Sequence, residues 1–207
     1  MEFTAWPKTP RLFRDAVITE KIDGTNAAVI VKLAEPSDYE DAPGDIFVVD
    51  SVAYRIGAQS RSRLIYPGQD NFAFAKWVWE NALGLIRTLG EGVHFGEWWG
   101  SGIQRGYGLL NGDKRFSLFN VHRYQKLLQE AAVVGIEVPG LDTVPVLDIH
   151  TFSTYRVEVA IQRLRENGSS AAPGFDRPEG VVVFHSQSRS VFKALLDNDD
   201  IPKGLAS

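Results

Sequence analysis

The chain has no cysteine among its 207 residues, and this absence excludes several classes of site. Disulfide bonds, cysteine-ligated zinc, iron–sulfur clusters and thiol catalysis all require that residue. No run of 18 uncharged apolar residues is present either, so we expect no transmembrane helix and no membrane partner. The first residues lack a basic segment followed by an apolar run, which argues against a signal peptide. These absences fit a cytoplasmic protein.

Charge of one sign is not in excess, because 22 lysines and arginines face 26 aspartates and glutamates and leave a net charge of −4. A nucleic-acid partner would therefore depend on a local basic patch rather than on the total charge. The hydrophobic content of 44% is that of an ordinary globular protein. No repeat, low-complexity tract or convincing linker divides the chain, so we expect one domain over residues 1–207.

Strand and helix patterns alternate along the chain and predict an α+β fold. We expect strands within 18–33, broken by a turn at Asp23-Gly24, and at 46–53, 93–99, 115–121, 144–149, 180–185 and 189–196. We expect helices at 71–89, 122–134 and 154–166. Residues 34–45, with five acids, and 167–178 are expected to be loops. Because several strands are close enough in sequence for hairpins, mainly antiparallel sheets flanked by helices are predicted.

The run from Glu20 to Asn26 (EKIDGTN) places Lys21 at the end of an apolar strand, just before a tight turn. A lysine amine is a strong nucleophile once it is neutral, and a pocket is where its surroundings can remove the proton. Gly24 would let the backbone approach a ligand closely. The structural alternative is a hairpin in which Lys21 and Asp23 are solvated.

Three further runs carry a charged side chain inside apolar sequence. Glu97 lies in HFGEWWG, where an ionised carboxylate could accept hydrogen bonds from ribose hydroxyls. Glu179 stands at the mouth of a Val-rich strand and could help to hold Mg²⁺. Lys193 lies between apolar residues in VFKAL and could contact phosphate. For each, the alternative is a strand residue that faces water.

In this order, the four runs resemble motifs I, III, IV and V of the covalent nucleotidyltransferases, which comprise ATP-dependent DNA ligases, RNA ligases and mRNA capping enzymes. Residues 60–63 (SRSR) resemble motif Ia, and residues 116–121 (FSLFNV) resemble motif IIIa. The endings Gly-Thr-Asn of the first run and Phe-Gly-Glu of the second are most similar to the RNA ligase 2 branch, which includes phage RNA ligases. The resemblance implies an ATP-grasp-like nucleotidyltransferase domain and, for a phage protein, the host cytoplasm.

The resemblance implies a role for each matching residue. Lys21 would attack ATP and carry AMP covalently, and Glu179 would organise Mg²⁺ or Mn²⁺. Lys193 would contact phosphate and stabilise developing charge. Around the nucleotide, the resemblance places Glu20, Ile22, Asn26, Arg61, Glu97 and Phe119. Arg61 and Arg63 would also meet the nucleic acid.

The sequence departs from the family pattern at three places. Motif V usually reads Lys-x-Lys, but here Val191 or Leu195 stands in place of one lysine. Motif IIIa often has Asp where this chain has Asn120. Only 14 residues follow Lys193, which leaves no room for an OB-fold or a small helical accessory domain. We therefore expect a bare catalytic domain, with an accessory protein as a candidate replacement.

These observations favour an ATP-dependent RNA ligase that seals 5′-phosphate and 3′-hydroxyl ends, on nicked duplexes or broken single strands. A minimal DNA ligase, a GTP-specific capping enzyme and a catalytically impaired nucleotide- or RNA-binding module remain alternatives. The glycine-rich loop at 100–112, with Gln104, Arg105 and Tyr107, could touch RNA. The four histidines lack the spacing of metal ligands and are expected to be structural.

Overall fold

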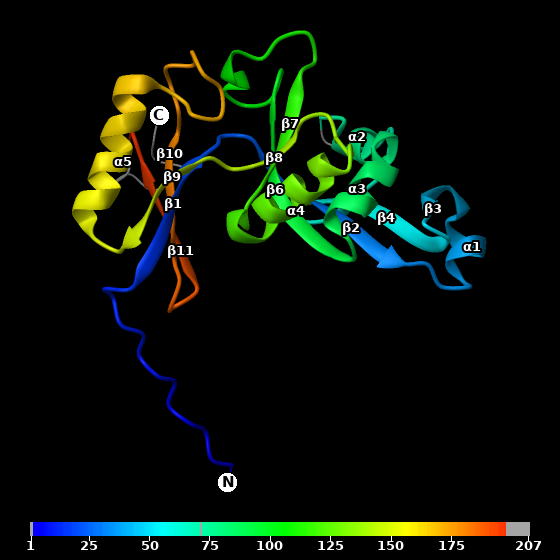
Figure 1. Cartoon of the computed structure of the whole chain (residues 1–207), viewed down its shortest axis with the longest axis horizontal. Helices are drawn as coiled ribbons and strands as arrows, with labels where there is room; N and C mark the ends of the chain where they lie inside the picture. The colour runs from blue at the N-terminus through cyan, green and yellow to red at the C-terminus, as the bar shows by residue number, and fades with distance from the viewer. Residues whose placement is uncertain (1, 71, 198–207) are drawn as a thin grey trace. The chain divides into compact units, whose positions relative to one another are not determined.

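The computed structural model describes residues 2–70 and 72–197 (Figure 1). The chain forms two compact units. One consists of residues 1–21 together with 145–207, and the other of residues 22–144. We call them the terminal unit and the central unit. In the described part of the chain, no helix is long and apolar enough to cross a membrane.

The terminal unit is an antiparallel sheet covered on one face by a helix. Its strand order is β11 (Ser190–Leu195), β10 (Gly180–His185), β1 (Asp15–Lys21) and β9 (Val146–Thr151). Helix α5 (Thr154–Asn167) begins at Ser153, whose side chain accepts a hydrogen bond from the backbone N–H of Arg156, as expected for an N-cap. Ile18 and Val183 pack with Leu164 of α5 in the unit's core. Because side chains alternate along a strand, Thr19 and Lys21 lie on the other face.

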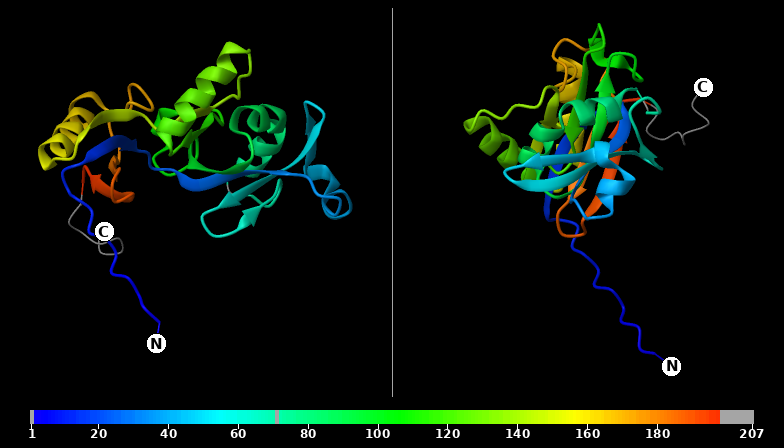
Figure 2. Two further views of the ribbon diagram at one scale, coloured as in Figure 1. Left: turned by 60° about the horizontal axis from the view of Figure 1, so that its bottom comes forward. Right: turned by 90° about the vertical axis from the view of Figure 1, so that its right-hand side faces the viewer.

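The central unit contains a second sheet. Its order is β3 (Ile46–Val49), β4 (Val52–Ser60), β2 (Thr25–Leu33), β6 (Gly92–Gly100), β7 (Lys114–Leu118) and β8 (Leu141–Thr143), with β5 (Leu64–Ile65) paired to β4. All pairs are antiparallel except β7 with β8. The larger helices are α2 (Phe74–Glu80), α3 (Ala82–Leu89) and α4 (Val121–Val133), seen from two further sides in Figure 2. Together the units confirm a mixed α+β fold with mainly antiparallel sheets.

The helices of the central unit share a core with one face of its sheet. Ala27, Val29 and Val31 of β2 belong to the same buried cluster as Val78 of α2 and Leu85 of α3. Alternation puts the neighbouring residues of β2 on the opposite face, which we call the open face. Residues of β4, β6 and β7 that pair directly across the sheet project to the same side, so the strand register assigns each of them to the core face or to the open face. This assignment decides which candidate side chains can meet.

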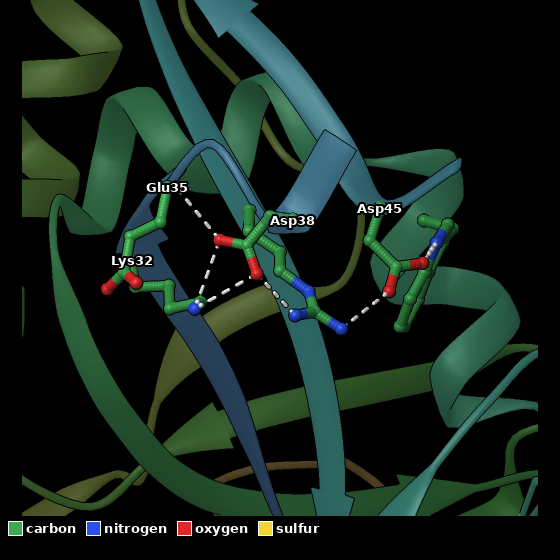
Figure 3. Close-up of polar contacts among 6 residues, drawn as sticks. Lys32, Glu35, Asp38 and Asp45 are labelled. Atoms are coloured by element: carbon green, nitrogen blue, oxygen red, sulfur yellow. Dashed lines mark hydrogen bonds and ion pairs between the residues drawn. The ribbon is translucent and has the colours of Figure 1, made fainter. Parts of the chain in front are cut away.

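The acidic segment 34–45 is not the solvated loop that the sequence suggested (Figure 3). It contains helix α1 (Asp38–Asp41) and the 3₁₀ turn Pro43–Asp45. Asp38 is 4% exposed, accepts a hydrogen bond from the backbone N–H of Glu35, and pairs with Lys32 and with Arg55 at 2.6 Å. The Glu35 N–H, assisted by Lys32 and Arg55, lowers the pKa of Asp38 to about 2. The composition of the segment could not predict the burial of Asp38, because its ion-pair partners Lys32 and Arg55 lie on β2 and β4.

Other boundaries also differ from the sequence expectations. The strands around Asp23-Gly24 form as expected, but β1 pairs with β9 and β10 while β2 pairs with β4 and β6, so they are not a hairpin. The expected strand 46–53 is a hairpin, turned at Asp50 and Ser51 with φ of 48° and 67°. The expected helix 71–89 is two helices that meet at Asn81; its first residue lies outside the described residues. Strand β8 was missed, because three residues are too few for a periodic pattern.

One smaller difference affects the candidate site. The strand expected at 115–121 ends at Leu118, and α4 begins at Val121.

The prediction of one nucleotidyltransferase domain without an accessory domain, and its ATP-grasp-like character, stay predictions.

Candidate functional site

Three polar side chains form a row across the open face of the central unit. Asn26 of β2 is the register partner of Glu97 of β6, and Glu97 is the partner of Ser117 of β7. Directly paired residues of antiparallel strands project to the same side. The sheet thus brings together two residues, Asn26 and Glu97, that separate sequence motifs assigned to nucleotide binding. Ser117, which the sequence did not single out, is 3% exposed, and its hydroxyl accepts a hydrogen bond from Nε1 of Trp99 at 2.9 Å, so it supports the sheet.

Gly24 fixes the turn that precedes this row. Its backbone N–H donates to Oε1 of Glu97 at 3.1 Å. A Cβ at position 24 would lie 2.5 Å from the carbonyl oxygen of Trp98, and a Cβ at Gly96 would lie 2.7 Å from the ring of Phe116. Both glycines are therefore required by contacts with protein atoms. The expectation that Gly24 serves the close approach of a ligand receives no support from this geometry.

The turn at Asp23 is also held by the glycine-rich loop at 100–112. The backbone N–H of Asp23 donates to the hydroxyl of Tyr107 at 2.8 Å, and Nε of Arg105 lies 3.1 Å from Oδ2 of Asp23. Tyr107 is 2% exposed and has φ of 50°. Both side chains therefore hold the turn after Lys21, and the contact of this loop with RNA, which the sequence also allowed, stays a prediction. Ile22 in this turn is 3% exposed, and its contact with a nucleotide stays a prediction.

Arg61 and Arg63 lie in the tight turn between β4 and β5. Ser60, the last residue of β4, pairs with Ala27, and its backbone N–H donates to the carbonyl of Arg63 at 2.8 Å. Because Asn26 precedes Ala27 and Arg61 follows Ser60, Arg61 comes directly after β4 at the level of Asn26. Both arginines are exposed, and neither forms an ion pair with another residue described in the structure. Two such cations can attract a phosphate chain.

Phe119 comes directly after β7 and stays beside β6. Its backbone N–H donates to the carbonyl of Phe95 at 3.0 Å, and its side chain is 41% exposed. The next residue, Asn120, is the N-cap of α4, and its side chain accepts from the backbone N–H of Arg123 at 3.3 Å. Asn and Asp cap helices about equally well. The departure from the family's Asp therefore leaves this structural role intact.

In the terminal unit, Lys21 meets the residue that precedes β10. Nζ of Lys21 lies 2.5 Å from Oε2 of Glu179, and the two side chains are 23% and 10% exposed. Lys21 is the register partner of Gly180, the first residue of β10, and Glu179 immediately precedes Gly180 in the chain. The sequence named both residues, and the fold joins them from positions 158 residues apart.

Glu20 is buried and its carboxylate is engaged within the protein. The residue is 1% exposed, and it accepts hydrogen bonds from Oγ of Ser169 at 2.6 Å and from the backbone N–H groups of Ser170 and Ala171 at 2.7 and 3.0 Å. Burial raises the pKa of Glu20 above its ordinary value, against the effect of these three donors. The side chain thus anchors the loop between α5 and β10. A contact of Glu20 with a nucleotide, expected chiefly through its backbone, stays a prediction.

Lys193 lies on the same face of the terminal sheet as Lys21. Lys193 pairs with Val182, which pairs with Thr19, two residues before Lys21. Strand geometry places the two lysines about 10 Å apart across the sheet and about 7 Å apart along it. Val191 and Leu195, the positions that lack the second lysine of motif V, alternate onto this face with Lys193. The structure therefore does not distinguish which of the two replaces it.

A metal ion would find few protein ligands here. No group of three or more His, Asp or Glu side chains among residues 2–70 and 72–197 could hold an ion. Mg²⁺ in phosphate-transfer sites is commonly held by one or two carboxylates, water and substrate phosphates rather than by an all-protein cage. Glu179, whose side chain is 10% exposed, fits that pattern as a single protein carboxylate.

Two of the histidines have structural roles, as expected. His94 is fully buried between the hydroxyl of Tyr124, 3.0 Å from Nδ1, and the carbonyl of Gly90, 3.0 Å from Nε2. Burial, with Arg123 nearby, lowers the pKa of His94 to about 4. His185 is 4% exposed and donates through Nε2 to the carbonyl of Leu12 at 2.7 Å.

Comparisons with known proteins bear on the family and on the fold. A sequence profile of the family described as RNA ligase matches residues 14–195. A solved structure of a Naegleria gruberi RNA ligase variant with AMP and Mn has a TM-score of 0.58 at 22% identity, over 89% of this chain and 50% of that one. A second variant, with ATP and Mn, gives 0.55 at 18% identity, over 90% and 51%. A comparison with curated protein sequences gives no match. The chain thus shares the fold and spans about half the length of these proteins.

Proposed function

The chain belongs to the RNA ligase family, and we propose that it uses ATP to join RNA ends that carry a 5′-phosphate and a 3′-hydroxyl. The observation that carries the proposal is the pairing of Lys21 with Glu179 at the end of β1, inside the matched residues. A lysine amine can act as a nucleophile, and a carboxylate beside it can help to hold the Mg²⁺ that accompanies a phosphate substrate.

In the first step, Lys21 is the nucleophile. Its amine releases a proton to solvent, and Nζ then forms a bond to the α-phosphorus of ATP. The bond between that phosphorus and the bridging oxygen breaks, and pyrophosphate leaves with the electron pair. The product is a phosphoramidate that links AMP to Lys21. Lys193, exposed on the same face of the terminal sheet, supplies a positive charge toward the phosphates.

The nucleoside is assigned to the open face of the central unit. Glu97 accepts hydrogen bonds from the ribose hydroxyls, with Asn26 beside it, and Phe119 stacks on the adenine. Strand geometry supports this pairing, because Glu97 and Phe95, the neighbour of Phe119, are two residues apart and so about 7 Å apart. That spacing suits a ribose and its base. Glu20 and Ile22, on either side of Lys21, complete the proposed contacts.

Glu179 is the residue that would hold Mg²⁺ or Mn²⁺ together with phosphate oxygens. Such an ion withdraws electron density from a phosphate and neutralises its charge. The Naegleria gruberi structures that this chain resembles contain Mn together with AMP or ATP, which supports the assignment.

In the later steps, AMP passes from Lys21 to the 5′-phosphate of an RNA. The 3′-hydroxyl of a second end then attacks that phosphate, and AMP leaves as the strands join. Arg61 and Arg63 are assigned to the RNA phosphates. The RNA is a nicked duplex or a broken single strand, and an accessory protein could supply contacts that longer relatives make themselves.

Two assays test the function. The chain is incubated with radiolabelled ATP or GTP, and then with nicked duplexes in which each strand is RNA or DNA. We expect labelling by ATP and not by GTP, and sealing when the joined strand is RNA. Labelling by GTP would select the capping reaction, and sealing restricted to DNA strands would select a minimal DNA ligase. ATP binding without a covalent adduct would select the catalytically impaired nucleotide- or RNA-binding module.

A further inference from the structure

Phe95 is an exposed aromatic residue for which the proposed function has no use. It lies on β6, two residues before Glu97, and its side chain is 47% exposed. The alternating residues His94 and Gly96 face the core side of the sheet, so Phe95 shares the open face with Glu97. A phenylalanine gains stability by burial, and one left half in water contributes little to the fold.

Phe95 lies directly beside Phe119. The backbone N–H of Phe119 donates to the carbonyl of Phe95 at 3.0 Å, which continues the pairing of Gly96 with Leu118 by one residue. Leu118 is buried in the core, so Phe119 turns to the opposite side, where it is 41% exposed. Two exposed rings thus occupy neighbouring positions on one face.

The apolar surface continues away from Glu97. Val93, two residues before Phe95 on β6, is 44% exposed, and its register partner Ile30 is partly exposed. ATP has one base, and the proposed function places that base on Phe119. Phe95 and Val93 therefore extend the surface beyond what a single nucleoside covers.

We propose that Phe95 is a stacking site for a base of single-stranded RNA, adjacent to the adenine site. This inference rests on the proposed function, which makes RNA the substrate and Phe119 the adenine contact. Proteins bind unpaired RNA bases by stacking them on exposed aromatic rings of open sheets, next to cations that attract the phosphates. Arg61 and Arg63, exposed at the end of β4 in the same sheet, supply those cations.

The test compares RNA binding with adenylylation in four forms of the full chain. These are the wild type, Phe95→Ala, Phe95→Tyr, and Tyr39→Ala as a matched control. Tyr39 belongs to the same unit, is 53% exposed and lies on α1. Fluorescence anisotropy measures the affinity for a short, labelled single-stranded RNA with a 3′-hydroxyl. Incubation with radiolabelled ATP measures adenylylation in parallel.

We expect Phe95→Ala to weaken RNA binding by roughly 5- to 150-fold, the range found when a base loses its aromatic partner. Phe95→Tyr and Tyr39→Ala should bind as the wild type does, and all four should react equally with ATP. Equal RNA affinity of wild type and Phe95→Ala, or no RNA binding by the wild type, would overturn the inference. So would loss of adenylylation in Phe95→Ala, because Phe95 would then belong to the adenine site.

The same measurements separate this inference from the proposed function. A chain that binds RNA through Phe95 but forms no adduct with ATP would keep the stacking site and contradict the ligase. A chain that forms the adduct but binds RNA equally with and without Phe95 would contradict the stacking site and leave the proposed ligase function in place.

Discussion

Nζ of Lys21 and Oε2 of Glu179 lie 2.5 Å apart, although the two residues are 158 positions apart in the sequence. Antiparallel pairing of β1 with β10 brings them together, because Lys21 is opposite Gly180. A Cβ at Gly180 would lie 2.3 Å from the carbonyl of Ala194, so this position must be glycine. The contact therefore follows from strand register and from one required glycine.

Replacing Glu179 tests the role of its carboxylate. Glu179→Gln keeps the size of the side chain and removes the charge that meets Lys21 and the proposed metal ion. We expect the rate of adenylylation to fall at least about tenfold and the Mg²⁺ concentration for half-maximal rate to rise. The free energy of unfolding should fall by no more than about 1–3 kcal/mol, because the amide oxygen of glutamine can still accept a hydrogen bond from Lys21. An unchanged rate at every Mg²⁺ concentration would contradict the assignment.

Glu20 is expected to stabilise the protein through the loop that leads to Glu179. Glu20→Ala removes both carboxylate oxygens, so the N–H groups of Ser170 and Ala171 lose their acceptor. We expect the free energy of unfolding to fall by about 1–3 kcal/mol, measured in urea at neutral pH. Ser169→Ala, which removes only one of the three donors, is the milder comparison. Equal stability of Glu20→Ala and wild type would show that the loop does not depend on this carboxylate.

Asn120 is expected to act as a helix cap rather than as a catalytic group. Asn120→Ala removes the acceptor for the N–H of Arg123 and should lower the free energy of unfolding by about 1 kcal/mol. Asn120→Asp keeps an acceptor, so we expect stability and adenylylation close to wild type. A large change in rate for Asn120→Asp, at unchanged stability, would indicate that this position takes part in catalysis.

His94 predicts a loss of stability in mild acid. Nε2 donates to the carbonyl of Gly90, so Nδ1 must accept from the hydroxyl of Tyr124, and protonation of Nδ1 would reverse that bond and place a positive charge in a buried site. The folded pKa of about 4 lies below the ordinary value of 6.5, so the unfolded chain binds more protons between these values. The free energy of unfolding should therefore fall as pH falls through this window, with a slope of up to about 1.4 kcal/mol per pH unit.

The control for this prediction is His94→Gln, which has no titrating ring. Its stability is measured by urea unfolding beside the wild type between neutral pH and pH 4. The two curves should converge toward low pH, since the wild type loses the contribution that the variant never had. Parallel curves would show that His94 does not carry this dependence.

Much of the fold could be predicted from local patterns. The long strands around Val29, Trp98 and Val183 and the capped helix after Ser153 follow from apolar runs, periodicity and capping chemistry. Strand partners could not be predicted, because they depend on contacts far along the chain. The hairpin at Asp50-Ser51 was hidden, since neither residue is a glycine although both have positive φ. The burial of Asp38 depended on cations from two other strands.

The candidate site shows the same division. Lys21, Glu97, Glu179 and Lys193 stand out in the sequence alone, because each is a charged residue inside an apolar run. Only the register of β2 with β6 shows that Asn26 and Glu97 are neighbours. The hydrogen bond from the backbone of Asp23 to Tyr107 could not be predicted from the local sequence, in which only the glycines around Tyr107 stand out. The two residues are 84 positions apart.

The most direct test of this account is the intact mass of the chain after incubation with ATP and Mg²⁺, measured beside Lys21→Ala and Lys21→Arg. The account predicts that the wild type gains the mass of one AMP. Both variants should stay unmodified while remaining folded in the absence of urea, since Lys21 is partly exposed and contributes little to the core. A folded Lys21→Ala protein that still gains AMP, or a wild type that gains none from ATP, would contradict the central claim.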